Sequence, residues 1–354
     1  MQTTETKKIF DQFTHSYFEN EVGFSALARS LGDQSFFITG GSGLFGRWIL
    51  SFFRWSIKKE LASPQVTILS RTSVPSQLSD WQFIQGDITD FQWGNLKVDY
   101  TMHLAAPSAQ ATFLGMNEIE KFNTLSSGIS RLLQFAHERT IKRVLISSSG
   151  AIYGGFGPER ALAIAENESN APLFTTQMQA LGLGKRVVEF FTKEFCDAGY
   201  IDASVARCFS FIGPGLPTDL HYAAGNFVDA ALNGKDIVIR GDGKPIRSFM
   251  YLGDMVLWFL TILLAGRSGQ DYNVGSREQV NIYQLASMVR NKCDLNLNIT
   301  VVGGENKTAG NPINYFYVPD TSKAELDLKL ECKTGLDKAL DLYIDYVKKV
   351  MSKR

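Results

Sequence analysis

The sequence predicts an α/β fold, in which a parallel β-sheet is covered by helices on both faces and is followed by a smaller C-terminal lobe. Two observations indicate this fold class. In the first half of the chain, short apolar runs alternate with longer segments whose apolar residues recur at helical spacing, as expected when helices join buried parallel strands. Beyond roughly residue 170 the strand-like runs become shorter and less regular, which indicates a second lobe beside the first.

The individual elements can be placed in order along the chain. Apolar runs predict strands at 35–39, 66–69, 100–104, 143–147, 203–207, 237–239 and 272–274. Apolar residues at helical spacing predict helices at 44–58, 129–139, 226–233 and 282–293. The longest apolar run, at 255–265, is shorter than the roughly 18 residues that a membrane span needs, so we expect a buried helix there.

An extension of 34 residues precedes the first predicted strand. Its apolar residues recur at helical spacing, so we expect one or two helices, packed on the outside of the main domain and carrying Ile9, Phe10, Phe13, Tyr17 and Phe18. We expect residues 35–175 to form the core of that domain, and 176–354 to hold its remaining elements interleaved with the C-terminal lobe. No repeat or low-complexity linker separates these parts, so we expect two lobes that share a cleft.

Composition argues against several classes of function. Lysine plus arginine and aspartate plus glutamate both number 36, so no overall basic charge recruits nucleic acid. The four cysteines are far apart and form no Cys/His ligand spacing, which argues against a metal site and for reduced thiols. The N-terminus has an early acidic residue and no apolar h-region, so no signal peptide is expected. We expect a cytoplasmic protein without a membrane segment.

A glycine-rich turn follows the first predicted strand. Gly40, Gly43 and Gly46 have the GxxGxxG spacing and stand between a strand and a helix. In this context the first glycine permits a tight turn, the second lets the backbone approach a pyrophosphate, and the third lets helix and strand pack closely. The amides at the helix N-terminus then face the phosphates. The segment predicts a dinucleotide site, with a purely structural turn as the alternative.

The end of the second predicted strand bears on the choice of cofactor. An acidic residue there usually binds the ribose 2′-hydroxyl of NAD, whereas an arginine accommodates the 2′-phosphate of NADP. Here Leu69 is followed by Ser70 and Arg71, without an acid. This pattern favours NADP over NAD, unless Arg71 is only a solvated surface residue. Asp87 lies in a later loop that could reach the adenine.

Several motifs in order together resemble one known family. They are TGGSGLFG (39–46), GDI (86–88), HLAAPS (103–108), SSSGAIYG (147–154), ARCFSFIGPG (206–215), GDGKPIRSFMYLGDMV (241–256) and YNVGS (272–276). From about residue 36 to its end, the chain resembles the extended short-chain dehydrogenase/reductase family, in its NAD(P)-dependent nucleotide-sugar epimerase/dehydratase branch. The resemblance implies a Rossmann-type doubly wound parallel sheet, a smaller C-terminal α/β lobe that binds a nucleotide diphosphate sugar, and hydride transfer involving NAD(P).

The resemblance also implies roles for individual residues. The implied catalytic residues are Ser149, which bonds the reacting sugar oxygen, and Lys185, which lowers the pKa of a tyrosine and bonds the nicotinamide ribose. The implied cofactor-binding residues are Gly40, Gly43, Leu44, Phe45, Gly46, Ser70, Arg71, Asp87, Ile88, Leu104, Ala105, Ala106 and Lys185. The implied substrate-binding residues are Ser108, Ser149, Asn226, Phe227 and Arg247. Arg247 would bond the diphosphate, and Asn226 and Phe227 would open a helix and present amides to it.

The chain departs from the family pattern at the tyrosine expected four residues before Lys185. Leu181 stands at that position and cannot carry a proton. Three explanations remain open. Another group, such as Tyr153, Tyr251, Glu166 or a water, does the proton work; or the reaction differs; or the chain is catalytically impaired.

A second departure follows Ser149. Dehydratases of this branch carry an Asp-Glu pair there and decarboxylases a Glu, whereas this chain has Gly150 and Ala151. Standard dehydration or decarboxylation is disfavoured, because a carboxyl group is needed to move protons at sugar carbons. We expect an NAD(P)-dependent enzyme of the epimerase/dehydratase family that transfers a hydride at C4 of the hexose. The alternatives are an NADPH-dependent 4-ketoreductase of a nucleotide-linked 4-keto-6-deoxy sugar, and a catalytically impaired cofactor-binding protein.

The resemblance further implies a homodimer. Two long helices per subunit, at 113–137 and 185–198, would form a four-helix bundle with their copies in the partner. The second helix has more apolar residues than one buried face needs, namely Val187, Val188, Phe190, Phe191 and Phe195.

Overall fold

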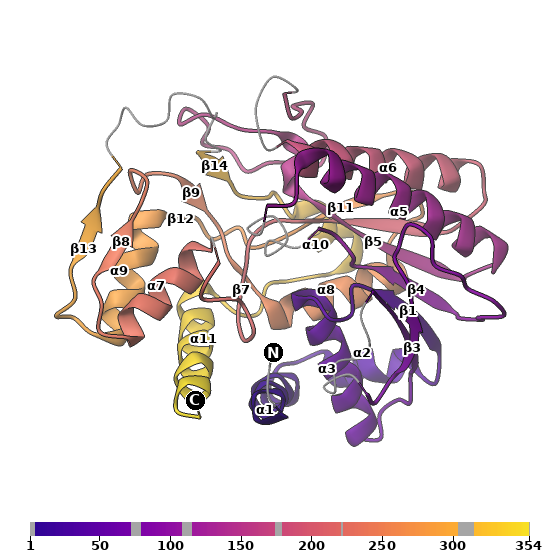
Figure 1. Ribbon diagram of the computed structural model, residues 1–354, viewed down its shortest axis with the longest axis horizontal. Coiled ribbons are helices and arrows are strands. Elements are labelled where there is room, and N and C mark those ends of the chain that lie inside the picture. Colours follow the sequence, from indigo (N-terminus) through magenta and orange to yellow (C-terminus); the bar gives the residue numbers. More distant parts are fainter. Residues whose placement is uncertain are drawn as a thin grey trace.

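A seven-stranded parallel sheet forms the centre of the computed structural model, which describes residues 4–71, 79–107, 115–173, 179–220, 222–303 and 315–353. Its strands are β1 (Ser35–Thr39), β2 (Gln65–Ser70), β3 (Gln82–Gln85), β4 (Tyr100–His103), β5 (Arg143–Ser149), β6 (Ala203–Cys208) and β11 (Asp271–Val274). They stand in the order β11-β6-β5-β4-β1-β2-β3, and every neighbouring pair is parallel. Figure 1 labels β11, β5, β4, β1 and β3 of this sheet. The strand order reverses between β1 and β4, where ligands of such sheets bind outside the carboxyl ends.

Helices cover both faces of the sheet. They are α3 (Leu44–Lys58) and α8 (Leu252–Ala265) on one face, and α5 (Glu118–Glu138) and α6 (Ala180–Asp197) on the other. Successive side chains of β1 point to opposite faces, so Phe36 is buried with α3 and α8 while Phe37 packs against Phe135 of α5. The predicted α/β fold with a doubly wound parallel sheet is confirmed.

The second half of the chain contributes a smaller lobe of short strands and two helices. Two small sheets have two strands each: β7 (Phe211–Ile212) pairs with β10 (Met250–Tyr251), and β8 (Ile237–Ile239) pairs with β13 (Ile299–Val301). A third sheet has three strands, in which β9 (Ile246–Arg247) lies between β12 (Val280–Asn281) and β14 (Phe316–Tyr317). The helices α7 (Ala223–Leu232) and α9 (Ile282–Cys293) pack against each other beside β8. Strands β9 and β14 run parallel and pair Arg247 with Tyr317. Residues that are distant in the sequence therefore meet in this lobe.

Two N-terminal helices, α1 (Thr4–Asn20) and α2 (Phe24–Leu31), pack against α3, and α1 also contacts the last helix, α11 (Leu336–Met351). The Tyr17 hydroxyl donates a hydrogen bond to Asp254 Oδ1 at 2.8 Å, and the Thr334 amide donates to Asp254 Oδ2 at 2.9 Å. Burial raises the pKa of Asp254 to about 6, although both hydrogen bonds oppose the shift. Asp254 therefore joins three segments that are far apart in the sequence.

Most elements lie where the sequence predicts them, and the exceptions have physical reasons. The edge strand β3 has no fully buried residue and so shows no apolar run. Helix α5 begins at Glu118, between the two predicted starts at 113 and 129, because a capping box at Asn117 starts it in a polar stretch. The predicted helix start at Asn226 is wrong, since α7 begins at Ala223. The apolar run 255–265 lies in buried α8, and none of the helices described could cross a membrane.

Candidate functional site

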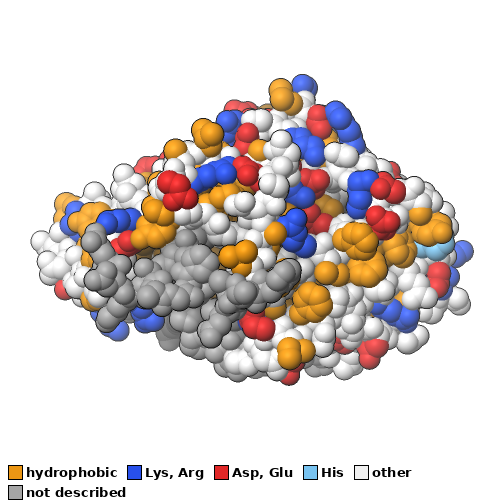
Figure 2. Space-filling model, turned by 90° about the horizontal axis from the view of Figure 1, so that it is seen from above, with side chains coloured by type: hydrophobic (Ala, Val, Ile, Leu, Met, Phe, Trp, Pro, Cys, Tyr) orange, Lys and Arg blue, Asp and Glu red, His pale blue; other side chains and the backbone are white. Residues whose placement is uncertain are grey.

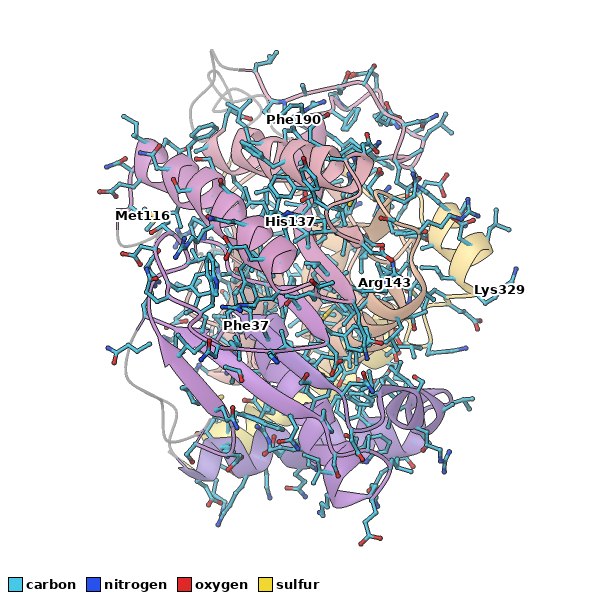
Figure 3. All side chains as sticks on the ribbon, turned by 90° about the vertical axis from the view of Figure 1, so that its right-hand side faces the viewer. Phe37, Met116, His137, Arg143, Phe190 and Lys329 are labelled. Atoms are coloured by element: carbon cyan, nitrogen blue, oxygen red, sulfur yellow. The ribbon has the colours of Figure 1, made fainter. Side chains whose placement is uncertain are left out.

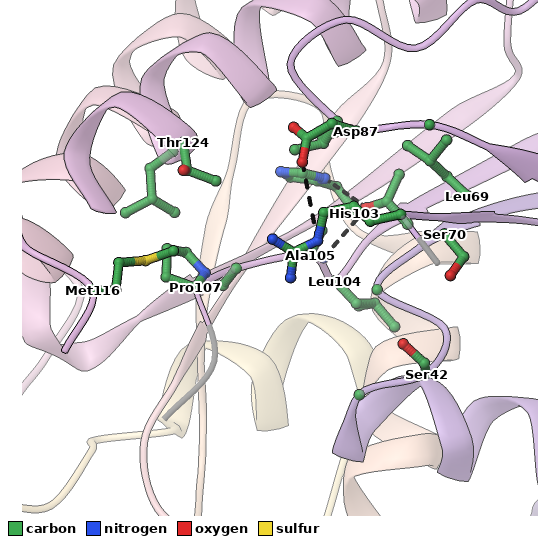
Figure 4. Close-up of a pocket in the computed structure, with 18 residues that line it drawn as sticks. Ser42, Leu69, Ser70, Asp87, His103, Leu104, Ala105, Pro107, Met116 and Thr124 are labelled. Atoms are coloured by element: carbon green, nitrogen blue, oxygen red, sulfur yellow. Dashed lines mark hydrogen bonds and ion pairs between the residues drawn. The ribbon is translucent and has the colours of Figure 1, made fainter. Parts of the chain in front are cut away.

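A cavity of about 240 Å³ lies at the carboxyl ends of β1, β2 and β4, next to the glycine-rich turn (Figure 4). Many of the predicted cofactor-binding residues line it, namely Gly40, Gly43, Ser70, Arg71, Asp87, Ile88, Leu104, Ala105 and Ala106. The structure thus brings together residues from four separate stretches of the chain. Their role in binding stays a prediction.

Close backbone contacts require glycine at two positions of the turn. A Cβ atom at Gly40 would lie 2.6 Å from the Ala105 nitrogen, and the φ of Gly40 is 75°. A Cβ atom at Gly46 would lie 2.5 Å from the Gly40 carbonyl oxygen. Side chains cannot be accommodated at such distances, so β1, β4 and α3 approach this closely only with glycine present. Helix α3 starts after Gly43 without a side-chain cap, which leaves its first amides beside the cavity.

The remaining predicted cofactor-binding residues lie outside the lining of this cavity. The ring of Phe45 packs against Phe211, with ring centroids 4.9 Å apart, and Leu44 packs against the same core. Gly46 lies behind the turn, and Lys185 is buried near the carboxyl end of β5. Phe45 and Gly46 therefore support the turn through packing.

The wall contributed by α5 is not evident from the sequence. Thr124 and Leu125 of α5 line the cavity together with Met116, which precedes that helix. An amphipathic helix shows the same spacing whether its apolar face covers a core or a cavity. Only the three-dimensional position of α5 beside the strand ends identifies these residues.

Arg71 and Asp87 lie at the rim of the cavity. The Arg71 side chain is largely exposed, and its Nε lies 4.0 Å from Asp87 Oδ2. Asp87 Oδ1 accepts hydrogen bonds from the amide and the hydroxyl of Thr89, at 3.0 and 2.8 Å. An exposed ion pair at this distance is weak. Arg71 is therefore neither buried nor tightly held, and its guanidinium is accessible to a ligand.

Lys185 is fully buried and belongs to a chain of hydrogen bonds along the strand ends. Its Nζ donates to the Ser147 carbonyl oxygen at 2.6 Å, and the Ser147 hydroxyl donates to the His103 carbonyl oxygen at 2.9 Å. Burial lowers the pKa of Lys185 to about 8. Burial also lowers the pKa of His103 to about 3, so this imidazole is neutral, and its Nδ1 lies 2.8 Å from Thr39 Oγ1. These bonds connect α6 to the ends of β5, β4 and β1.

Ser149 ends β5 and lies against a tyrosine of the C-terminal lobe. Its hydroxyl accepts a hydrogen bond from the Ala151 amide at 3.2 Å. Burial raises the pKa of Tyr317 above its usual value, and a hydrogen bond with the Ser149 side chain opposes that shift. The Tyr317 hydroxyl also lies 3.4 Å from the Cys208 carbonyl oxygen. A Cβ atom at Gly150 would lie 2.6 Å from the Tyr317 hydroxyl, so the missing side chain leaves the space that this phenol occupies.

Arg247 is the predicted diphosphate ligand, and it is paired with Tyr317 across β9 and β14. Its Nη1 donates to the Ile246 carbonyl oxygen at 2.8 Å, and the described part of the chain provides no carboxylate partner. Burial lowers the pKa of Arg247. A half-buried guanidinium without a counter-charge favours the binding of an anion.

The predicted Asn226–Phe227 pair is not placed as expected. Because α7 begins earlier, the Asn226 amide already donates to the Tyr222 carbonyl oxygen at 2.9 Å. Phe227 is buried in the core. Asn226 therefore offers its exposed side chain rather than its amide. Ser108, another predicted substrate ligand, lies outside the described residues.

The other candidates for proton transfer are held in structural contacts. Tyr153 Oη donates to Asn273 Oδ1 at 2.8 Å, and Glu166 Oε1 accepts from the Asn273 amide at 2.8 Å. Tyr251 is buried against Tyr17, with ring centroids 4.7 Å apart. Tyr317, which sequence reasoning missed, is the tyrosine found next to Ser149 in the described part of the chain. No motif marks it, because only the pairing of β14 with β9 brings it there.

Comparisons with known proteins identify relatives of the chain. A model of the NAD dependent epimerase/dehydratase family matches residues 36–275. UDP-glucuronic acid decarboxylase 6 of Arabidopsis thaliana is 27% identical over 317 residues, which cover 86% of both chains. Human dTDP-D-glucose 4,6-dehydratase is 26% identical over 217 residues, which cover 60% of this chain and 59% of the relative.

Solved structures share the fold. UDP-glucose 4-epimerase of Thermotoga maritima, solved with UDP-glucose, gives a TM-score of 0.77 at 21% identity and covers 90% of this chain and 99% of its own. UDP-glucuronic acid 4-epimerase of Bacillus cereus, solved with UDP-glucuronic acid and NAD, gives 0.74 at 20% identity and covers 89% and 99%. The family match spans most of the chain and agrees with the Rossmann-type fold and the glycine turn. The chain belongs to the NAD-dependent epimerase/dehydratase family.

Proposed function

We propose that the protein is an enzyme that binds a nicotinamide dinucleotide and transfers a hydride at C4 of the hexose of a nucleotide diphosphate sugar. One observation carries this proposal: the cavity where the glycine turn, the uncapped start of α3 and three strand ends converge. Gly40 and Gly46 leave no room for a Cβ atom, and Gly43 exposes backbone to the cavity, which fits a bound pyrophosphate. The dinucleotide, when bound, supplies or accepts the hydride.

The residues outside the cavity support a nucleotide sugar as the substrate. A guanidinium such as that of Arg247 can bond a diphosphate through two nitrogens, and Arg247 lacks a competing carboxylate among the described residues. Ser149 offers a hydroxyl at the end of β5 for the reacting sugar oxygen. The relatives reported above are named for UDP-linked or dTDP-linked sugars, which supports the same class of substrate here.

The choice between NADP and NAD depends on Arg71. Its exposed guanidinium and the missing acid after β2 favour NADP, because a 2′-phosphate would find a cation there. The neighbouring carboxylate of Asp87 weakens that attraction, and the Bacillus cereus epimerase was solved with NAD. We propose a nicotinamide dinucleotide, with a preference for NADP that rests on this one side chain.

The reaction proposed here involves no loss of water or carbon dioxide. Gly150 and Ala151 provide no carboxyl group next to Ser149 for moving protons at sugar carbons. Epimerisation requires the hydride to leave and return, whereas ketoreduction requires only its delivery. Ketoreduction is the second candidate, since Leu181 leaves no phenol one turn before Lys185.

The first experiment identifies the small molecules released from the purified protein by mass and absorbance, and then incubates the protein with a panel of nucleotide sugars and their 4-keto derivatives. Conversion with a cofactor that stays bound and is recycled supports epimerisation. Stoichiometric oxidation of NADPH supports ketoreduction. Cofactor binding without conversion or binding of any sugar would reject both reactions and leave a cofactor-binding protein.

We also propose a homodimer formed through α5 and α6. Phe190 of α6 is 61% exposed, and Figure 3 shows it on the outer side of that helix, while Ile119 of α5 is 73% exposed. Figure 2 shows hydrophobic side chains gathered on the face seen from above, where these helices lie. Covering such a surface favours association. Sedimentation velocity at micromolar concentration should show a dimer, and a monomer would contradict the proposal.

A further inference from the structure

A proton-transferring group for the proposed reaction has to lie within hydrogen-bond reach of the oxygen that Ser149 contacts. Leu181 cannot serve, because its side chain carries no ionisable proton. The Tyr153 hydroxyl and the Glu166 carboxylate are engaged with Asn273, and Tyr251 is buried against Tyr17. Another ionisable side chain therefore has to meet Ser149.

Tyr317 meets this requirement through contacts on several sides. Its hydroxyl donates a hydrogen bond to the Cys208 carbonyl oxygen at 3.4 Å and lies close enough to the Ser149 side chain for that group to lower the pKa of the phenol. Its ring packs against Phe209, with ring centroids 4.6 Å apart. Its strand partner is Arg247, the proposed diphosphate ligand. The phenol is therefore held between the group that would orient the sugar and the group that would bind its phosphates.

The glycine after Ser149 is complementary to this phenol. A Cβ atom at Gly150 would lie 2.6 Å from the Tyr317 hydroxyl and 3.0 Å from the ring of Phe209. Any side chain at residue 150 would therefore displace Tyr317 from Ser149. Of the two departures from the family pattern, Leu181 provides no phenol before Lys185, and Gly150 leaves the space that the Tyr317 phenol occupies.

We propose that Tyr317 is the proton donor of this site and that it acts together with Ser149 on a sugar ketone. The inference rests on the proposed function and selects its reductive direction. Addition of the hydride forms a C–H bond at the carbonyl carbon, and the C=O π pair becomes a lone pair on oxygen. The Tyr317 O–H bond then breaks, and its proton makes that oxygen a hydroxyl. The remaining phenolate regains a proton from water, so NAD(P)H is oxidised and the ketone is reduced.

The electrostatic surroundings of Tyr317 agree with this direction. Burial is the largest influence and raises the pKa of the phenol, while Ser149 and Arg247 oppose the shift. The phenol is therefore protonated near neutral pH and can donate a proton to a developing alkoxide. The same burial makes it a poor base for removing a proton from a sugar alcohol.

The test compares Tyr317→Phe with the wild-type protein in the reduction of a nucleotide-linked 4-keto sugar by NADPH or NADH. Turnover should fall at least about 100-fold, because general acid catalysis contributes that much, while KM for the sugar and the dissociation constant of the dinucleotide stay unchanged. Tyr315→Phe is the matched control, since it also removes a phenolic hydroxyl from this segment. The Tyr315 hydroxyl donates a hydrogen bond to Asp242 Oδ2 at 2.6 Å. Tyr315→Phe should keep wild-type turnover.

Two further variants separate proton donation from a structural role. Gly150→Ala should lower turnover by displacing the phenol, and adding it to Tyr317→Phe should cause no further loss, because both changes remove the same contact. Leu181→Tyr in the Tyr317→Phe background should restore part of the turnover by returning a phenol to the position before Lys185. Thermal unfolding checks that each variant is folded. If Tyr317→Phe does not fold, the turnover of Gly150→Ala decides the test.

The outcomes distinguish this inference from the proposed function. If the wild-type protein reduces a 4-keto sugar and the folded Tyr317→Phe variant does so equally well, the inference is wrong and the proposed function stands. Additive losses in the double variant also contradict it. If the wild-type protein binds the dinucleotide and converts no sugar in either direction, the proposed function fails and the inference fails with it.

Discussion

The two halves of the candidate site are built in different ways. The cofactor cavity is lined mainly by backbone and small residues from the ends of neighbouring strands β1, β2 and β4. The sugar side depends on single side chains, Ser149, Arg247 and Tyr317, which come from β5, β9 and β14. Parallel strands present their carboxyl ends at one edge, so the strand order brings together most of the first half, and α5 adds one wall. The second half is assembled only when the short strands of the C-terminal lobe pair.

This contrast has a consequence for substitutions. Where a site is formed by closely packed backbone, substitution of a key residue disturbs the fold. Where a site is formed by single side chains, a substitution can change the chemistry and leave the fold intact. The departures at Leu181 and Gly150 lie on the sugar side, and the glycine turn is intact. Substitutions in the two halves should therefore affect the dinucleotide and the sugar separately.

Gly46→Ala should have the largest effect. A methyl group there would lie 2.5 Å from the Gly40 carbonyl oxygen, so α3 has to move away from the turn. We expect dinucleotide binding to be lost and stability to fall by about 3 kcal/mol or more. Calorimetric titration and chemical unfolding measure the two effects. Gly241→Ala, where nothing lies within 4 Å of the new methyl group, is the control and should change neither. Normal binding by Gly46→Ala would contradict the backbone account.

Lys185→Met should separate catalysis from stability. Turnover should fall about 100-fold or more, because the buried ammonium is lost from the site. Stability at neutral pH should rise by roughly 1 kcal/mol, because burial of that charge, which lowers the pKa of Lys185 to about 8, is unfavourable. Turnover assays and chemical unfolding at neutral pH measure the two effects.

The pH dependence of stability provides a second measure of Lys185. In the wild-type protein, between pH 8 and the ordinary lysine value of 10.5, the unfolded chain binds the proton of residue 185 more tightly than the folded chain does. This group therefore makes stability rise with pH across that window, and Lys185→Met should lack its share of the rise. Chemical unfolding at several alkaline pH values measures the difference. Equal slopes for both proteins would mean that Lys185 is not buried as a charge.

Arg247→Ala should affect the sugar side alone. Loss of charge-assisted hydrogen bonds worth roughly 1.5–3 kcal/mol should raise KM for the nucleotide sugar about 10- to 100-fold. The dissociation constant of the dinucleotide should stay the same, because Arg247 does not line the cavity. Arg247→Lys should recover only part of the loss, since an ammonium cannot bond two phosphate oxygens in the same fork geometry. Equal weakening of both ligands would show that the halves are not separable.

Arg71→Ala should have the smallest effect. Because its guanidinium is exposed, removing it should weaken NADP binding only about 3- to 10-fold and leave NAD binding unchanged. Direct titration with both dinucleotides measures the ratio of the dissociation constants of NADP and NAD. If Arg71→Ala leaves this ratio unchanged, Arg71 is only a solvated surface residue and the argument for NADP is lost.

The same contrast explains what could be predicted from the sequence. Apolar runs predict the buried strands such as β1 and β5, and the glycine spacing predicts the turn, because both are local patterns. The start of α7 is not predictable from the sequence, because no polar side chain caps this helix. The cavity wall that contains Thr124 is not predictable either, because it depends on the position of α5 in the assembled fold. Tyr317 is the clearest example: its contact with Ser149 depends entirely on the pairing of β14 with β9.

The position of the N-terminal helices bears on how the protein is made. Phe10 of α1 contacts Trp48, which is synthesised soon afterwards, but also Tyr346 of α11, and Tyr17 bonds both Asp254 and Thr334. During translation Asp254 and Thr334 leave the ribosome 237 and 317 residues after Tyr17. Part of the aromatic face of α1 therefore stays uncovered while most of the chain is being synthesised, and it is exposed to chaperones or to self-association during that time. Burial of α1 can therefore be completed only after these distant segments have been synthesised.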